Sequence, residues 1–590
     1  MKNNYNWNLK EIFENEEKFE NATQELYKLI KKLENYKGKL EESVDNIYEF
    51  HKIYEKAMEL FEKIYAYGMM TYHQDMSEDT SIRLYKRVEK ISTDFSTSIS
   101  FKSPEISKID NSVLKEYLKD KRMKPYEKNI KDIIKEKRHI LSEEIEGILS
   151  QYSEVFSTSE NAYEVFTNTE FEYPNIKDSN GKELKMSASL YSKYMTDKNE
   201  KIRKQAFESM YSLYKKHINS ITELYLSRVK AVVISSRIRG YKSSLDAGTY
   251  RDDSSVKVYE TLINEVNKNL KTNHEYIKLK AKFLKKDKLN MYDVYVNPLN
   301  VETKNIEYNE AKNIVLDALS PLGNEYTKML DYAFKNNWID VYAKDNKMSG
   351  AYSLGIHNVH PFVLLNYINS ARDVSTMAHE LGHAMHSFYA SKSQNIINAN
   401  YTIMVAEVAS TVNEIILANY LINNEKNKKR KAALINEQLD MIRTTLFRQS
   451  MFAEFEKDIH EKIESDESLT SEDLNEIYYK LVKKYFGSHV VINDEIKYEW
   501  ARIPHLYRCF YVYKYSTGIT SAIVIASNIL AGKSGYVEKY INMLSQGGIK
   551  DSLTLLKMVD VDLEKEETYE VAFKYFKDNL KKLEELMKSK

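Results

Sequence analysis

The sequence predicts a mainly α-helical fold with two or more lobes. Residues that break helices are few, with 7 Pro and 16 Gly in 590 residues. Apolar side chains instead recur at helical spacing, as in Leu26, Leu29, Ile30 and Leu33, which mark one buried helix face. A chain of this length also exceeds a single compact core, so we expect more than one lobe.

The N-terminal third reads as helices followed by a short β segment. Residues from Trp7 to about Val165 run as successive amphipathic helices. Between residues 167 and 184, Phe171 and Tyr173 alternate with polar residues before Asp178-Ser179-Asn180-Gly181, which predicts a hairpin turn. Residues 1–190 are therefore the expected N-terminal helical region, ending in a hairpin-like segment.

The remaining residues, 191–590, form the expected catalytic region. Long helices resume near Asp197 and continue past Ser235. A second β-like zone covers roughly Trp338 to Phe362 and ends at the helix that carries the main motif.

Composition limits the partners and the compartment. Lys+Arg and Asp+Glu both number 87, so the formal net charge is zero and nucleic acid is a poor candidate partner. The single cysteine, Cys509, excludes an internal disulfide and fits a reducing compartment. Residues 1–8 do not resemble a secretory signal, and Ile519 to Leu530 is too short and too polar to cross a bilayer. We therefore expect a cytoplasmic protein with no membrane partner.

The pentapeptide His379-Glu380-Leu381-Gly382-His383 reads HExxH and predicts a hydrolytic zinc site. Residues four apart share a helix face, so both His side chains can bind one Zn²⁺ while Glu380 points at the open coordination position. The residues on either side contain no Pro and favour a helix. Glu380 is the predicted general base, which accepts a proton from the attacking water and returns it to the departing amine.

A catalytic zinc with two His ligands needs a third protein ligand. The metzincin pattern would place a His six residues past His383, where this chain has Tyr389, so that class is excluded. Glu407 lies in a run of small and apolar residues, where a charge is unfavourable unless it is paired or bound to metal, and is the predicted ligand. Glu414, two turns later on nearly the same helix face, is predicted to bond a ligand His or a neighbouring main chain. We expect one Zn²⁺ per chain.

Two nearby residues have a plainer interpretation. His386 shares the helix face of His379, yet a helix presents only one i, i+4 pair to a metal, so we predict a supporting or simply packed side chain. Cys509 lies four residues after His505, but a nucleophilic thiol needs a lowered pKa and an oriented base, and a small buried residue is the better interpretation. The alternative for the whole set is a helical core whose His and Glu bond only to one another.

The HExxH motif, with Glu407 placed 24 residues after its second His, resembles the oligoendopeptidase F branch of the thimet oligopeptidase-like (M3) zinc metallopeptidases. Three further stretches resemble segments of that family and follow in its order: Gly240 to Ala247, Ser349 to Ser353 with His360 to Tyr367, and Ala501 to Gly518. The resemblance spans roughly residues 110 to 580.

The resemblance implies an architecture and further site residues. It implies a helical two-lobed ellipsoid with a deep central channel, zinc on the channel floor and a small β-sheet beside it. It also implies that hydrogen-bond donors to the oxyanion come from the C-terminal segment, where we favour His505 and Tyr511 and keep Tyr507 as the alternate. Gly350-Ala351-Tyr352 is the candidate edge strand that pairs with the substrate main chain.

The function predicted from these observations is a cytoplasmic zinc endopeptidase that hydrolyses internal bonds of short oligopeptides. A zinc exopeptidase that releases one or two terminal residues is the first alternative. The second is a helical scaffold that binds peptides and has a structural zinc or none; Glu380 argues against it, because a structural site has no use for a general base.

Overall fold

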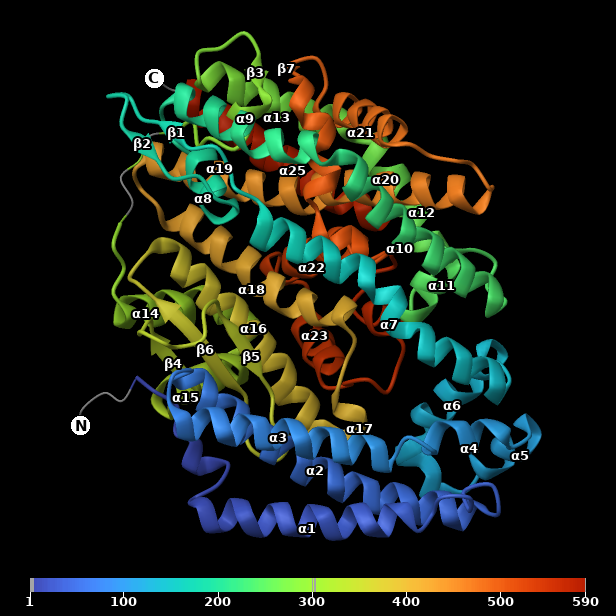
Figure 1. Ribbon diagram of the computed structural model, residues 1–590. Helices are drawn as coiled ribbons and strands as arrows, with labels where there is room; N and C mark the ends of the chain where they lie inside the picture. Colours follow the sequence, from blue (N-terminus) through green and yellow to red (C-terminus); the bar gives the residue numbers. More distant parts are fainter. Residues whose placement is uncertain (1–4, 300, 302–303, 589–590) are drawn as a thin grey trace. The chain divides into compact units, whose positions relative to one another are not determined.

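The computed structural model describes residues 5–299, 301 and 304–588. Most of the regular structure is α-helical, which confirms the predicted fold class (Figure 1). The chain forms two compact units, each built from three separate segments. Unit 1 contains Met1–Arg138, Thr303–Leu417 and Ile525–Val561, and unit 2 contains His139–Glu302, Ala418–Val524 and Asp562–Lys590.

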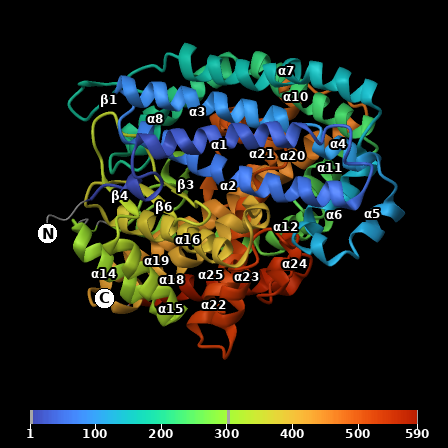
Figure 2. The same ribbon diagram turned by 90° about the horizontal axis from the view of Figure 1, so that it is seen from below.

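Unit 1 begins with long helices that lie side by side, α1 (Glu16–Glu34), α2 (Val44–Gln74) and α3 (Asp79–Ser98) (Figures 1 and 2). The side chains of Asn15 and Ser43 cap the first two helices by accepting backbone N–H bonds. The apolar face predicted for α1 is buried. The other helices of this unit are α4 (Lys102–Lys108), α5 (Asn111–Tyr117), α6 (Glu127–Glu136), α14 (Tyr308–Ala318), α15 (Asn324–Lys335), α16 (Ala371–Ser393), α17 (Ile396–Ala399), α23 (Tyr536–Leu544) and α24 (Ser552–Lys557).

A small three-stranded sheet in unit 1 lies where the second β-like zone is predicted. It contains β4 (Ile339–Tyr342), β5 (Tyr352–Leu354) and β6 (Phe362–Tyr367), in the order β4-β6-β5. The central strand β6 pairs parallel with β4 and antiparallel with β5, so β5 is an edge strand of this sheet. Helix α16 packs against both β5 and β6 (Figure 1).

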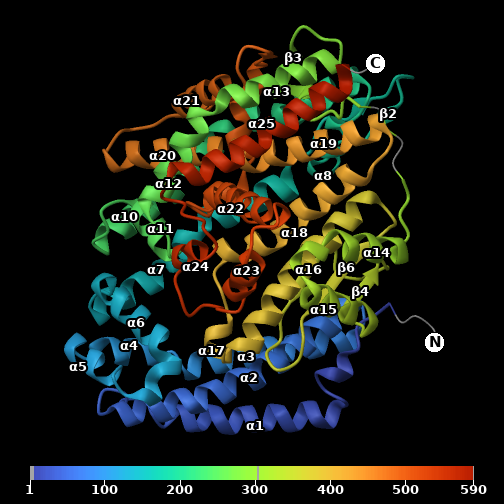
Figure 3. The same ribbon diagram turned by 180° about the vertical axis from the view of Figure 1, so that it is seen from behind.

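Unit 2 is helical with two very short strand pairs. Strands β1 (Ile176–Lys177) and β2 (Glu183–Leu184) form an antiparallel hairpin at the predicted turn, and β3 (Leu289–Asn290) pairs parallel with β7 (Val490–Val491). In Figure 3, α25 runs along α13 and α19. The helices of this unit are α7 (Glu143–Val165), α8 (Ala188–Met195), α9 (Glu200–Lys216), α10 (Ile218–Ile238), α11 (Ser244–Arg251), α12 (Val256–Lys268), α13 (Leu270–Phe283), α19 (Lys428–Ile442), α20 (Arg448–Glu464), α21 (Ser471–Phe486) and α25 (Glu566–Lys588).

Two long helices, α18 (Ile403–Asn424) and α22 (Tyr513–Leu530), are strongly apolar in composition. By length and composition alone, α18 could span a membrane, but 56% of its most apolar window is buried within the chain. This burial indicates a packed helix within the protein, and the helix also carries Glu407 and Glu414. The segment Ile519 to Leu530 lies in α22, and its residues 519–526 are buried, as expected of a packed helix.

Candidate active site

Helix α16 carries the HExxH motif and starts directly after strand β6. Ser370 caps the helix: its hydroxyl accepts the Asp373 N–H at 3.2 Å, and Asp373 Oδ2 accepts the Ser370 N–H at 2.9 Å. The same carboxylate accepts the N–H of Ile368 at 2.9 Å. This capping box fixes the first turn, so His379 lies more than two turns inside a regular helix.

Three donor atoms, from α16 and α18, meet beside the motif. The Nε2 atoms of His379 and His383 are 3.2 Å apart. Glu407 Oε2 lies 3.7 Å from the first nitrogen and 3.9 Å from the second. Zinc bonds of about 2.0–2.2 Å at tetrahedral angles separate neighbouring ligand atoms by about 3.3–3.6 Å. The three residues predicted as ligands therefore converge with a spacing that fits one zinc ion.

The glycine inside the motif sets the distance between the two helices. A Cβ atom added to Gly382 would lie 2.6 Å from Ser410 Cα and 2.7 Å from the Ala409 carbonyl oxygen, both in the backbone of α18. Asn413 on α18 donates a side-chain hydrogen bond to the Ala378 carbonyl at 3.0 Å. The close approach of α16 and α18 thus depends on the missing side chain, and it is what brings the third carboxylate to the His pair.

Outer contacts orient both imidazoles. Glu414 Oε1 lies 3.5 Å from His379 Nδ1, on the side away from the other donors. His383 makes a hydrogen bond to the backbone of Ala406. Such contacts fix the tautomer and the ring orientation of a metal-binding His. The Glu407 side chain is 41% exposed, so the argument that selected it as a buried charge was wrong, although the residue lies where a ligand is needed.

Burial dominates the electrostatics of the motif. It raises the pKa of Glu380 to about 7; the charge of His379 opposes this shift, and Glu407 adds to it. Burial, together with the charge of His379, lowers the pKa of His383 to about 4. For His379, burial acts to lower the pKa, but the hydrogen bond and charge of Glu414 outweigh it and raise the pKa. A metal competes with protons for these nitrogens, so metal binding is expected to weaken in acid.

His386 lies away from the three donors, in a fully buried position. Its ring stacks on Tyr401, with centroids 3.4 Å apart and an interplanar angle of 7°. Neither ring nitrogen has a hydrogen-bond partner among the described residues. Burial lowers the pKa of His386 to about 3, so the ring is neutral. This arrangement is that of a packed side chain, which is one of the two roles that the sequence left open for His386.

The predicted donor segment belongs to unit 2. His505 and Tyr511 stack with ring centroids 6.0 Å apart, and both are partly exposed. Tyr515 packs edge-on against both, at 6.0 and 5.5 Å. Burial and the charge of Arg508 lower the pKa of His505. Sequence reasoning missed Tyr515, although its i, i+4 spacing from Tyr511 was a usable signal.

Tyr507 differs from Tyr511 in its surroundings. It is 2% exposed, and its ring stacks on Tyr163 at 4.5 Å. Its hydroxyl is buried without a hydrogen-bond partner among the described residues, and its backbone carbonyl accepts a bond from Arg228 Nε at 2.8 Å. Tyr507 is therefore a packed core residue of unit 2, and Tyr511 is the more accessible of the two candidates.

The segment predicted to bind substrate leads into the edge strand β5. Gly350 and Ala351 precede the strand and Tyr352 begins it; Gly350 has a left-handed φ of +82°. The Tyr352 hydroxyl lies 2.9 Å from His73 Nδ1. After the strand, a Cβ on Gly355 would lie 2.6 Å from the Ser387 Cβ on α16, so the end of β5 lies against the helix that carries the motif.

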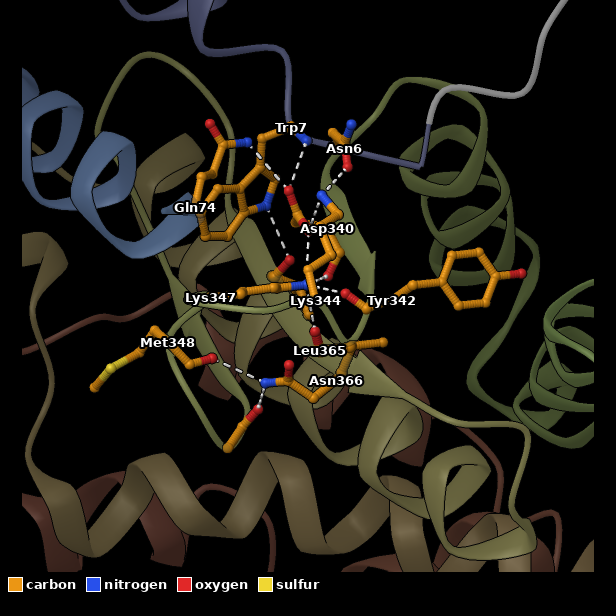
Figure 4. A network of polar contacts seen from close by, with 12 residues as sticks. Asn6, Trp7, Gln74, Asp340, Tyr342, Lys344, Lys347, Met348, Leu365 and Asn366 are labelled. Atoms are coloured by element: carbon orange, nitrogen blue, oxygen red, sulfur yellow. Dashed lines mark hydrogen bonds and ion pairs between the residues drawn. The ribbon is translucent and has the colours of Figure 1, made fainter. Parts of the chain in front are cut away.

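A buried lysine and an asparagine hold this segment in place (Figure 4). Lys347 Nζ donates to Asp340 Oδ1 at 2.6 Å, and both side chains are completely buried. Lys347 also donates to the backbone carbonyls of Tyr342, at the end of β4, and Leu365, in β6. Asn366 donates to the carbonyls of Met348 at 2.9 Å and Gly350 at 2.7 Å. The approach to β5 is thus tied to β4 and β6 by side chains that sequence reasoning did not single out.

Comparisons with known proteins agree over nearly the whole chain. The model of peptidase family M3 matches residues 193–575, and a model described as oligopeptidase F matches residues 105–173. Oligopeptidase PepF of Bacillus subtilis is 37% identical over 98% of this chain and 87% of its own length. An oligoendopeptidase F homolog of Borreliella burgdorferi is 36% identical over 99% of this chain and 98% of its own.

Solved structures give the same result for the fold. A crystal structure from Chlamydophila abortus, described as a peptidase, superposes with a TM-score of 0.93 at 28% identity and covers 99% of both chains. The oligoendopeptidase-F structure from Enterococcus faecium has a TM-score of 0.74 at 30% identity, with coverage of 97% of this chain and 99% of that one.

Proposed function

This chain belongs to peptidase family M3 and is a metalloendopeptidase, and from this premise we propose that it uses a zinc ion to hydrolyse internal bonds of short oligopeptides in the cytoplasm. The observation that carries the proposal is the convergence of His379, His383 and Glu407 beside Glu380. The compartment is supported by the single cysteine, which is buried and unpaired.

The proposed roles follow from the contacts of each side chain. His379, His383 and Glu407 hold the metal, with Glu414 behind the first His. A zinc ion at this position supplies Lewis acidity, which lowers the pKa of a water to about 7 and polarises the scissile carbonyl. The Glu380 carboxylate accepts a proton from the attacking water and passes it to the departing amine nitrogen as the C–N bond breaks.

Charge that develops on the carbonyl oxygen needs hydrogen-bond donors besides the metal. We assign this role to His505 and Tyr511, on the resemblance of their segment to the family and on their partial exposure within unit 2. Burial lowers the pKa of His505, so near neutral pH its ring is uncharged and can still donate one N–H. Tyr507 is not favoured, because its ring is packed against Tyr163.

The edge strand is the proposed guide for the substrate main chain. Strand β5 pairs on one side with β6, and an extended peptide can add to its other side by backbone hydrogen bonds. Backbone pairing does not depend on side-chain identity, so broad sequence tolerance is expected. The segment Gly350-Ala351-Tyr352 is held by Lys347 and Asn366, which favours a preformed strand.

The test is hydrolysis of an internally quenched peptide blocked at both ends, together with metal analysis of the purified protein. We expect cleavage at an internal bond, loss of activity with a chelator and recovery when zinc is added. A protein that cuts only the unblocked peptide is an exopeptidase. Full activity after complete removal of zinc would contradict the proposed chemistry.

A further inference from the structure

Three side chains of the types that bind metals lie together inside unit 2. Glu456 and His460 are one turn apart on helix α20, and Cys509 follows the 3-10 turn Pro504–Tyr507. One ligand atom from each side chain lies within 4.8 Å of the other two. The residues are 0%, 2% and 8% exposed, so the group is closed to solvent.

Glu456 and His460 each have one polar atom that makes a hydrogen bond and one that makes none among the described residues. Glu456 Oε2 and His460 Nε2 have no hydrogen-bond partner among the described residues. Glu456 Oε1 accepts the Phe510 N–H at 2.7 Å, and His460 Nδ1 lies 2.9 Å from the Ser244 hydroxyl. A buried polar atom without a partner destabilises the folded protein. In metal sites, a ligand side chain commonly binds the metal through one atom and makes a hydrogen bond to an outer group through its other polar atom.

We propose that Glu456, His460 and Cys509 bind a second divalent ion of the zinc class. Thiolate and imidazole together favour zinc over magnesium or calcium, and one carboxylate is compatible with it. The negative charges of a carboxylate and a thiolate balance the two positive charges of the ion, so the occupied site is neutral. Neutrality matters here, because an uncompensated charge in a closed interior is strongly unfavourable.

Without the ion, the same burial keeps all three groups uncharged. It raises the pKa of Glu456 to about 8 and that of Cys509 to about 12, and it lowers the pKa of His460 to about 3. Binding of the ion therefore releases the thiol proton and, below about pH 8, the carboxyl proton to the solvent.

The proposed ion would link a strained turn to helix α20 through shared coordination. Phe510, directly after Cys509, has a left-handed φ of +60°, which is unfavourable for a residue with a bulky side chain. Its N–H is held by Glu456, and its ring lies 4.5 Å from that of His460. A Cβ on Gly248 would lie 2.6 Å from the Phe510 ring, so the turn is also closely packed from the other side. The ion would hold the backbone that leads into Tyr511.

The test measures zinc in the full chain, with and without the HExxH ligands. The protein is exchanged against zinc and freed of loosely bound metal by gel filtration. We expect two equivalents in the unaltered chain, one in the His379→Ala/His383→Ala chain, and none when Cys509→Ala is added. His51→Gln, which alters another buried His, should leave the metal content unchanged. The deciding comparison is made in the His379→Ala/His383→Ala chain. If that chain holds no metal, or keeps its metal when Cys509→Ala is added, the proposal is overturned.

A spectroscopic measurement identifies the ligand without relying on stoichiometry. Cobalt(II) loaded into the His379→Ala/His383→Ala chain should give a thiolate-to-metal charge-transfer absorption, because Cys509 is the chain's only thiol. Loss of the band in the near-isosteric Cys509→Ser variant, with helicity preserved, supports the site. A cobalt-loaded chain without the band overturns it. Both readouts are taken without the HExxH ligands, so failure of the proposed peptidase chemistry does not affect them.

Discussion

At the residue scale, Glu380 tests the chemistry most directly. The side chain lies on helix α16 but is not one of the three converging donors. Glu380→Gln should therefore keep the zinc content of the unaltered chain while turnover falls by at least about a hundredfold, the lower range for loss of a general base. Zinc analysis and single-turnover hydrolysis check this. Zinc loss equal to that of a His379→Ala control would show that Glu380 is a ligand.

Glu407 and Glu414 should differ in how strongly they hold the metal. The first supplies a donor atom to the site, and the second lies 3.5 Å from the outer nitrogen of His379. Glu407→Ala should release zinc during chelator competition, whereas Glu414→Ala should lower zinc affinity by about 10- to 100-fold. Greater loss from Glu414→Ala than from Glu407→Ala would reverse the two assignments.

Tyr511 and Tyr507 offer a matched pair, because Tyr→Phe removes only a hydroxyl. Tyr511→Phe should lower kcat by about 10²–10³ with little change in KM, as expected for loss of one preorganised donor. Tyr507→Phe should leave kcat nearly unchanged, because that hydroxyl is buried and unpartnered among the described residues. Steady-state kinetics and zinc content are measured for both. If Tyr507→Phe loses activity and Tyr511→Phe does not, the assignment is reversed.

Sequence reasoning selected three candidate ligands that converge in the structure, but one of its arguments for them was wrong. The positions of His379 and His383 follow from helix periodicity alone, which any regular helix satisfies. The choice of Glu407 rested on a burial argument that its exposure contradicts. The two tyrosines could not be separated, because an aromatic residue reads the same in a core and at a site. Only the three-dimensional contacts of Tyr507 distinguish them.

At the element scale, the contact between α16 and α18 is the determining feature of the site. A Cβ on Gly382 meets the backbone of α18, which cannot move aside as a flexible side chain can. Gly382→Ala should therefore destabilise the protein by about 1–3 kcal/mol, as overpacking does, and weaken zinc binding by moving Glu407 away. Thermal melting and chelator competition provide the measurements.

Gly147 in α7 is the matched control for Gly382. Nothing lies within 4 Å of the Cβ that Gly147→Ala would add. That change should stabilise the helix by about 0.5–1 kcal/mol, because Ala loses less conformational freedom than Gly. If Gly382→Ala behaves like Gly147→Ala and keeps its zinc, the close approach of the two helices does not position the ligand.

Most elements could be predicted from the sequence because their apolar periodicity is long and regular. The short helix α8 (Ala188–Met195) was missed, since eight residues after a hairpin give little periodic signal. Strand β6 extends to Tyr367, beyond the predicted end of the β zone, because its buried apolar run has no alternation to mark its limits. The buried Lys347–Asp340 pair gave no signal, since a Lys in a polar loop is ordinarily exposed.

At the scale of the whole molecule, the resemblance predicts a walled channel that admits only flexible chains. Peptides of about 5 to 20 residues should be cut, while the same sequence in a rigid loop of a folded protein should survive, because the substrate backbone must extend to pair with a strand. Mass spectrometry of both digests makes the comparison, with the unfolded form of the same protein as the control. Rapid cleavage of the folded protein at the embedded sequence would contradict the channel.

The division of the chain into interleaved units is the part of the fold that local patterns could not supply. Amphipathic periodicity identifies which face of a helix is buried but not which distant segment covers it. The predicted regions 1–190 and 191–590 follow the order of the sequence, whereas each compact unit gathers three separated segments.

That interleaving has a consequence for biosynthesis. Unit 1 is complete only when Ile525–Val561 has joined Met1–Arg138 and Thr303–Leu417. At about 5–20 residues per second, a ribosome needs more than about twenty seconds after completing residue 138 to deliver that last segment. During this interval α1, α2 and α3 exist without all their final neighbours. The nascent chain therefore cannot form the complete unit 1 until its synthesis is nearly finished, and exposed helix faces must be kept from aggregating until then.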